Sequence, residues 1–199
     1  TSGEQPGFSR QTLEGHAGAL TLKTQGRTVL DGALLGQGGS AAAAGGSFAL
    51  ESNRPDGQVE LPDARRIVVT PGRNSVPAEE GFSDATINID ELTATGFEKL
   101  RLQSENRIEF QGSSTLAFDR GIRLDAPLID VAGSSKVNLQ ASTVSLGQTL
   151  GERQLLSTGD VPVWLVAGGT ASPVLETRAG SGELRVEAGA VDLFGSITV

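Results

Sequence analysis

Short runs in which apolar and polar residues alternate recur along the chain, most regularly between residues 97 and 146. Each run is a triplet, such as Leu100-Arg101-Leu102 or Ile108-Glu109-Phe110, and spacers rich in polar residues, Gly and Ser separate the triplets. A period of two turns the outer residues of a triplet to one side and the middle residue to the other, as in a pleated strand. No run is long enough for a helix. The pattern predicts many short β-strands, each with one apolar face.

The spacing of the triplets is nearly constant. Leu100, Ile122 and Val144 begin triplets 22 residues apart, and Ile108 and Ile129 begin triplets 21 residues apart. Three triplets in each interval of about 20 to 22 residues are typical of three-sided coils that stack on one another. One triplet buries too little apolar surface to offset the cost of ordering its backbone, whereas stacked coils pair their backbone groups and share one core. We therefore expect an all-β fold, a three-sided parallel β-helix.

The same interval predicts which residues share a wall elsewhere in the chain. Each predicted pair is separated by 20 or 21 residues, which is one coil. The predicted pairs are Leu116 with Val137, Val144 with Trp164, Trp164 with Leu184, and Ile67 with Ile87 of the triplet Ile87-Asn88-Ile89.

The 199 residues are predicted to form a single β-helical segment. Residues 36–47 read GQGGSAAAAGGS and are interpreted as a flexible excursion from the wall, with the alternative that the four Ala pack in a narrow corner. Residues 147–162 are expected to form an irregular coil or loop. Because the chain stops within the strand-like triplet Ile197-Thr198-Val199, we expect it to be a fragment of a longer solenoid.

Composition narrows the possible partners. Sixteen basic and 24 acidic residues give a net charge of −8, which disfavours binding to nucleic acid or to an anionic membrane surface. No apolar run approaches the ~20 residues of a membrane span, so membrane insertion is not expected, and no signal peptide opens the chain. The absence of Cys fits the cytosol, but it also fits a protein exported unfolded through a narrow pore.

Two pairs of charged residues are candidates for surface contact with a ligand. Glu109 and Asp130 occupy equivalent middle positions 21 residues apart, so they form the best stacked carboxylate pair for glycoside cleavage, although a middle residue ordinarily just faces water. Arg101 and Arg123 stack in the same way on a neighbouring face, with Ser145 next, and could bind a glycan or a phosphate. The acidic residues expected to balance these two Arg are Glu105, Asp119 and Asp125.

Other chemistry has weaker support. His16 is the single His and has no partner for a zinc site, and no cofactor is expected. Trp164 could stack on a sugar, but its place in the 20-residue register favours a role in the core. Arg65 and Arg66 are interpreted as part of a solvated charge cluster.

Residues 91–131, ELTATGFEKLRLQSENRIEFQGSSTLAFDRGIRLDAPLIDV, resemble the coils of filamentous-haemagglutinin-like exoproteins, which are the secreted partners of two-partner secretion systems in Gram-negative bacteria. The resemblance is carried by the TATGFEKL run before Leu100 and by the IRLDAP run from Ile122. It implies a right-handed β-helix that crosses the outer membrane through a dedicated β-barrel transporter. The secretion signatures at the amino terminus of that family are absent here, so the resemblance implies an interior or carboxy-proximal piece.

The expected function is therefore not enzymatic. We expect a monomeric segment of a secreted protein of the bacterial cell surface, which acts as an adhesin, a biofilm scaffold or a toxin-delivery stalk and contacts polysaccharide or the surface of a host or neighbouring cell. One alternative is a β-helical polysaccharide lyase or glycoside hydrolase, whose sign would be a carboxylate cluster with Arg or Lys in a groove. Another is a phage or pilus-like fibre component, which would be trimeric.

Overall fold

The computed structural model describes residues 15–30, 32–40, 42–53, 64–72, 82–148 and 181–194, and the statements that follow concern these residues. They form mainly β-strands, together with one short helix. The strands are arranged in two sheets, and every pair of neighbouring strands is parallel. The all-β part of the prediction is confirmed.

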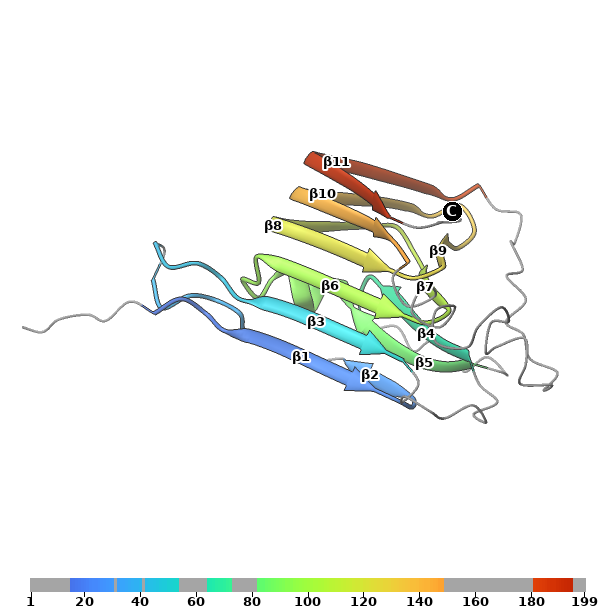
Figure 1. Cartoon of the computed structure of the whole chain (residues 1–199), viewed down its shortest axis with the longest axis horizontal. Helices are drawn as coiled ribbons and strands as arrows, with labels where there is room; N and C mark the ends of the chain where they lie inside the picture. The colour runs from blue at the N-terminus through green and yellow to red at the C-terminus, as the bar shows by residue number, and fades with distance from the viewer. Residues whose placement is uncertain are drawn as a thin grey trace, which may run out of the picture.

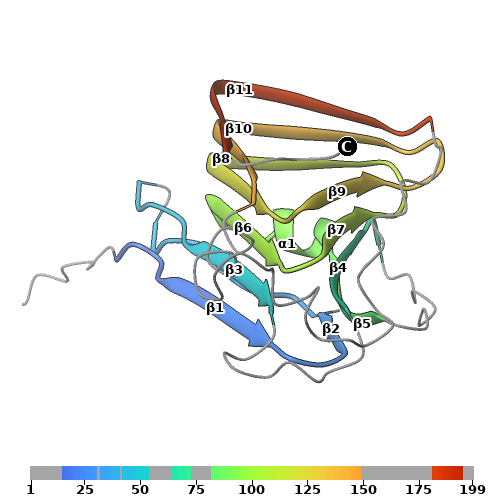
Figure 2. The same ribbon diagram turned by 45° about the vertical axis from the view of Figure 1, so that its right-hand side comes forward.

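In the six-stranded sheet, the strands lie side by side in the same order as in the chain, β1-β3-β6-β8-β10-β11 (Figure 1). Its strands β8, β10 and β11 have 12 residues each, whereas β1, β3 and β6 have six. Figure 2 shows that the long strands bend, so that their first and second halves run in different directions. The bounds are β1 Ala19–Thr24, β3 Ser47–Ser52, β6 Lys99–Ser104, β8 Ser114–Asp125, β10 Lys136–Gly147 and β11 Glu183–Phe194.

The five-stranded sheet departs from sequence order, because it runs β2-β5-β4-β7-β9. Strand β5 lies between β2 and β4, on the opposite side of β4 from β7. The prediction that Ile87 stacks one coil beyond Ile67 is therefore wrong: Ile67 pairs with Ala85, and Ile87 pairs with Val69. A spacing of one coil does not determine on which side of a strand the next strand adds. The bounds are β2 Thr28–Leu30, β4 Ala64–Thr70, β5 Phe82–Asn88, β7 Arg107–Phe110 and β9 Leu128–Val131.

The predicted columns of apolar side chains build the core between the two sheets. Leu100, Ile122 and Val144 pair in adjacent strands, and Ile108 pairs with Ile129, as their spacing predicts. All five are buried in one hydrophobic cluster. Burying a side chain of this size contributes about 1.5–3 kcal/mol, so the continuous columns are the main source of stability.

Two predicted registers are wrong. Leu116 pairs with Leu139, and Val137 lies opposite Ser114, a shift of two residues that keeps the same face because the side-chain period is two. Leu184 pairs with Val137, and Val191 takes the place beside Val144. Strand β11 thus stacks directly on β10, at an interval more than twice the predicted coil length. Trp164 and residues 149–162 of the predicted irregular coil lie outside the described residues.

One short helix, α1 (Ile89–Thr93), interrupts the strands where the sequence predicts a triplet. The side chain of Asn88 accepts hydrogen bonds from the backbone N–H groups of Asp90 and Glu91, which satisfies donors that a helix start leaves unpaired. Ile89 and Leu92 are buried in the shared core. The helix packs against β8 (Figure 2).

The Gly- and Ala-rich tract at residues 36–47, of which the structure describes all but residue 41, lies against the turn after α1. The N–H of Gly36 donates to Thr95 O at 2.8 Å, and Gly45 N donates to Glu98 Oε1 at 2.7 Å. A Cβ added at Gly36 would lie 2.3 Å from the ring of Phe97, so this contact requires Gly. The flexibility of the tract stays a prediction, as does the single-domain organisation.

Candidate functional site

The predicted carboxylate pair is brought together by the five-stranded sheet. Glu109 and Asp130 are direct partners in β7 and β9. However, Glu109 is only 3% exposed, so the expectation that this middle residue faces water is wrong. A buried carboxylate that faces two Arg side chains is poorly placed to reach a polysaccharide, and this arrangement does not support a role in glycoside cleavage.

Both faces of this sheet are buried at its centre, and an ion-pair network occupies the face turned away from the core. Arg66, 1% exposed, donates from Nε and Nη2 to the two carboxylate oxygens of Asp84 at 2.8 and 2.7 Å, and from Nη1 to Glu109 Oε2 at 2.9 Å. Arg107 Nη1 lies 3.5 Å from Glu109 Oε2 and 4.0 Å from Asp130 Oδ2. The interpretation of Arg66 as a solvated charge is thus wrong, and its role is structural.

Arg65 is also buried, at 3% exposure, so the predicted solvated cluster is wrong for both Arg of the pair. Its backbone carbonyl accepts a hydrogen bond from Ser104 Oγ at 2.7 Å, which links β4 of one sheet to β6 of the other.

The predicted Arg column on the six-stranded sheet is confirmed in its register. Arg101 pairs with Arg123, and Arg123 pairs with Ser145. Arg123 Nη2 donates to Asp125 Oδ2 at 3.4 Å, as expected, whereas Arg101 Nη1 lies 3.7 Å from Glu51 Oε1. The Arg123 guanidinium also lies 4.7 Å from the ring centroid of Phe194. Their side chains are 42% and 41% exposed. Contact with a ligand stays a prediction for these two residues.

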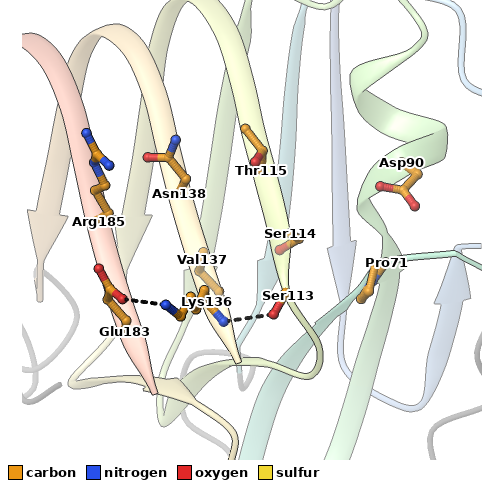
Figure 3. Close-up of a pocket in the computed structure, with 10 residues that line it drawn as sticks. All are labelled: Pro71, Asp90, Ser113, Ser114, Thr115, Lys136, Val137, Asn138, Glu183 and Arg185. Carbon is orange, nitrogen blue, oxygen red and sulfur yellow. Dashed lines mark hydrogen bonds and ion pairs between the residues drawn. The ribbon is translucent and has the colours of Figure 1, made fainter. Parts of the chain in front are cut away.

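A polar groove of about 560 Å³ lies over the beginnings of β8, β10 and β11, with α1 at one end (Figure 3). It contains two carboxylates, two cations, three hydroxyls and one amide. Figure 3 shows that Thr115, Asn138 and Arg185 form a row across three adjacent strands, and the register makes them direct partners. The lining residues are Pro71, Asp90, Ser113, Ser114, Thr115, Lys136, Val137, Asn138, Glu183 and Arg185.

The groove leaves hydrogen-bonding capacity unused. Within the described part of the chain, the buried atoms Asn138 Oδ1 and Ser114 Oγ have no hydrogen-bond partner. A buried polar atom without a partner costs about 1–3 kcal/mol. The charges of the groove are partly engaged, because Lys136 Nζ lies 3.6 Å from Glu183 Oε2 and Asp90 Oδ2 accepts from Gly72 N at 2.9 Å.

The sequence did not reveal this groove, because its residues fall in the polar spacers and at middle positions of triplets. The two-residue shift of β10 against β8 places Asn138 beside Thr115 rather than beside Ala117. The long stretch of chain between β10 and β11 brings Arg185 beside Asn138, on the side opposite Thr115. Neither shift follows from a constant coil length. The signal available in the sequence was the concentration of Ser, Thr and Asn at residues 113–115 and 134–138.

Other classes of site have little support in the described ranges. No group of three or more potential metal ligands occurs among the residues that the structure describes. His16 lies on the surface, where its Nδ1 accepts a hydrogen bond from Ala44 N at 2.8 Å. Among these same residues, no helix has the length and apolar character that a membrane span requires.

Comparisons with protein-family models, curated proteins and solved structures find no match to this chain.

Proposed function

We propose that this chain is a segment of a right-handed, three-sided parallel β-helix whose role is to bind polysaccharide without cleaving it. The parallel register of both sheets supports the architecture. Support also comes from the long strand β8, whose halves form two sides of a coil, with β9 of the other sheet as the third. Such a coil spans residues 114–131, close to the predicted length.

The observation that carries the binding proposal is the row of Thr115, Asn138 and Arg185 in the polar groove. Adjacent strands lie about 4.8 Å apart, so the row presents a hydroxyl, an amide and a guanidinium at regular intervals. An extended sugar chain presents hydroxyl groups that both donate and accept, which fits this mixture of groups. One groove of this kind gives weak affinity, which repeated sites on one surface would strengthen.

A neutral polysaccharide fits better than an acidic one. The two cations of the groove are already engaged, because Lys136 Nζ lies 3.6 Å from Glu183 Oε2 and Arg185 Nη2 lies 2.7 Å from Glu187 Oε1. The whole chain carries a net charge of −8, which repels a polyanion over a longer range. The ligand class that we propose is therefore a neutral glycan such as dextran or galactomannan.

Cleavage is the second candidate, because the groove does contain two carboxylates and two cations. In the structure, the Glu183 carboxylate is paired with Lys136, and the Asp90 carboxylate accepts from a backbone N–H. A general acid and base must instead be available to the substrate. These contacts favour binding over turnover.

The test is to measure binding of dextran, galactomannan and polygalacturonate by isothermal titration calorimetry, with an assay for released reducing ends. The Thr115→Val, Asn138→Leu double variant should bind a neutral glycan about tenfold more weakly, since two lost hydrogen bonds amount to about 1–3 kcal/mol. Thr143→Val is the matched control, because Thr143 lies in the second half of β10, outside the groove, and its hydroxyl donates to Arg120 O. Equal affinities of both variants, tightest binding to polygalacturonate, or turnover that Asp90→Asn abolishes would each overturn the proposal.

The biological setting that we propose is a secreted exoprotein of the bacterial cell surface, carried across the outer membrane by a β-barrel transporter. It would serve as an adhesin, a biofilm scaffold or a stalk. The resemblance of residues 91–131 and the absence of Cys support it. Expression of the encoding gene with and without the gene of a β-barrel transporter for two-partner secretion tests it: surface exposure, measured by protease accessibility on intact cells, should require the transporter. Accumulation inside the cell in both cases would contradict it.

A further inference from the structure

The outward face of the six-stranded sheet carries a pair of Arg side chains that lie outside the polar groove. Arg101 of β6 and Arg123 of β8 are direct partners in adjacent strands, and their side chains are 42% and 41% exposed. Neighbouring strands are about 4.8 Å apart, so two positive charges start from positions close to each other. Like charges at paired positions destabilise a sheet, and a bound anion would remove that repulsion.

The carboxylates beside these two Arg compensate their charge only in part. Arg101 Nη1 lies 3.7 Å from Glu51 Oε1, and the same carboxylate also contacts Lys23, whose Nζ lies 3.1 Å from Glu51 Oε2. Arg123 Nη2 donates to Asp125 Oδ2 at 3.4 Å. One carboxylate is thus shared between two cations, and the other is at the long end of the hydrogen-bond range.

This part of the face is positive although the chain is acidic. On the outward positions of β1, β3, β6 and the second half of β8, four basic side chains stand with two acidic ones, a net charge of +2. The next charged outward position is Asp192 on β11, two strands beyond Arg123. The basic residues are Lys23, Lys99, Arg101 and Arg123, and the acidic residues are Glu51 and Asp125.

Neighbouring side chains already hold both guanidinium groups in position. Arg101 Nη2 donates to Gln103 Oε1 at 2.7 Å, and the Arg123 guanidinium lies 4.7 Å from the ring centroid of Phe194, a cation–π contact. The ring uses the space that Gly147 leaves, because a Cβ added there would lie 2.7 Å from Phe194 Cδ2. Both Arg Nε atoms are buried, so a ligand would meet the Nη atoms. A guanidinium that is held in place loses less conformational entropy when it binds.

We propose that Arg101 and Arg123 together bind the phosphate monoester of a phosphorylated sugar. Such a group carries a charge of about −1.5 to −2 at pH 7 and three acceptor oxygens, which complements a net charge of +2 and two guanidinium donors. A carboxylate or a sulfate ester carries one negative charge and complements this surface less well. Ser145, the next residue of the same column, offers a hydroxyl to the hydroxyl groups of the sugar.

This inference goes beyond the proposed binding of a neutral glycan and uses another part of the sheet. The net charge of −8 acts against a long polyanion. A single phosphate group instead responds mainly to charges within about 10 Å, the screening length at 0.1 M salt. The local charge of +2 therefore decides whether it binds, and the half-exposed position of both Arg makes the affinity weak and dependent on salt.

Amide NMR titrations of the full chain with glucose-6-phosphate, glucose-6-sulfate, glucuronate and glucose test the proposal. The four ligands share one sugar ring and differ in the group at its sixth carbon. The phosphate ester should bind most tightly and should shift the amide signals around Arg101 and Arg123, whereas glucose should leave those signals unchanged. Equal affinity for the phosphate and sulfate esters, or shifts that cluster elsewhere in the chain, would overturn the proposal.

Substitutions separate a built site from general attraction to positive charge. Arg101→Gln and Arg123→Gln should each weaken binding of glucose-6-phosphate about tenfold, since each removes a charge-assisted contact. Arg123→Lys keeps the charge but loses the planar donor group, so it should also bind more weakly than wild type. Arg27→Gln is the matched control, because it removes the same charge from an exposed position between β1 and β2 and should leave the affinity unchanged.

The sugar part of the ligand has its own test. Ser145→Ala should weaken binding of glucose-6-phosphate and leave binding of inorganic phosphate unchanged, because the hydroxyl contacts only the sugar. Circular dichroism checks that every variant folds. The proposal fails if Arg27→Gln costs as much affinity as Arg123→Gln, if Arg123→Lys binds as tightly as wild type, or if Ser145→Ala binds both ligands as wild type does.

Discussion

The buried ion-pair network of the five-stranded sheet gives a sharp test of the fold, through the substitution Arg66→Met. Met keeps much of the volume of Arg but removes the three hydrogen bonds to Asp84 and Glu109. Both carboxylates are at most 5% exposed, so water cannot replace the guanidinium. Removing one partner of a buried ion pair costs about 3–5 kcal/mol. For a chain of this size, that corresponds to a fall in Tm of about 6–20 °C.

The matched control is Arg101→Met in the six-stranded sheet. Arg101 is also the middle residue of a triplet, but its side chain is 42% exposed and lies 3.7 Å from its carboxylate partner. An exposed pair of this kind contributes about 0–1 kcal/mol. Urea denaturation followed by circular dichroism measures both free energies of unfolding. The Arg66→Met, Asp84→Leu double variant should recover part of the lost free energy of unfolding, because it removes one of the two buried carboxylates that Arg66→Met leaves without a guanidinium partner. Equal costs for Arg66→Met and Arg101→Met would refute the buried network.

Two smaller changes probe local structure by the same denaturation assay. Gly36→Ala should destabilise the chain by about 1–3 kcal/mol, because the new methyl group would overlap the ring of Phe97, whereas Gly26→Ala, with no atom within 4 Å of the added Cβ, should not be destabilising. Equal stability of the two variants would show that residues 36–47 do not pack as described. Asn88→Ala should cost about 1 kcal/mol, since it removes the acceptor at the start of α1, and Asn88→Asp should retain most of that stability; a cost shared by both variants would contradict the capping role.

The sequence predicted those parts of the fold that depend on a regular period. The columns through Leu100, Ile122 and Val144, and through Ile108 and Ile129, follow from alternation within triplets and constant spacing between them. The prediction failed where the spacing is regular but the topology is not. Strand β5 enters the sheet on the other side of β4, and β11 follows β10 after a much longer interval.

The candidate site was harder to predict than the fold. Glu109 and Asp130 are neighbours as predicted, but no sequence pattern indicated that both faces of their sheet are buried, because a buried and an exposed middle position look alike in a triplet. The polar groove depends on a two-residue shift between β8 and β10, which leaves the apolar pattern unchanged. Alternation determines which face a residue occupies, and only the register determines its neighbours.

The central claim is that successive strands stack in parallel in the described order, and disulfide formation between introduced Cys pairs tests it most directly. Arg101, Arg123 and Ser145 lie in one outward column on consecutive strands. Neighbouring strands are about 4.8 Å apart, within the range of a disulfide, whereas strands separated by another strand are about twice as far apart. The Arg101→Cys, Arg123→Cys variant should form an intramolecular disulfide on mild oxidation, and Arg101→Cys, Ser145→Cys should not. Efficient cross-linking of the second pair, or of neither, would contradict the stacking order on which the account depends.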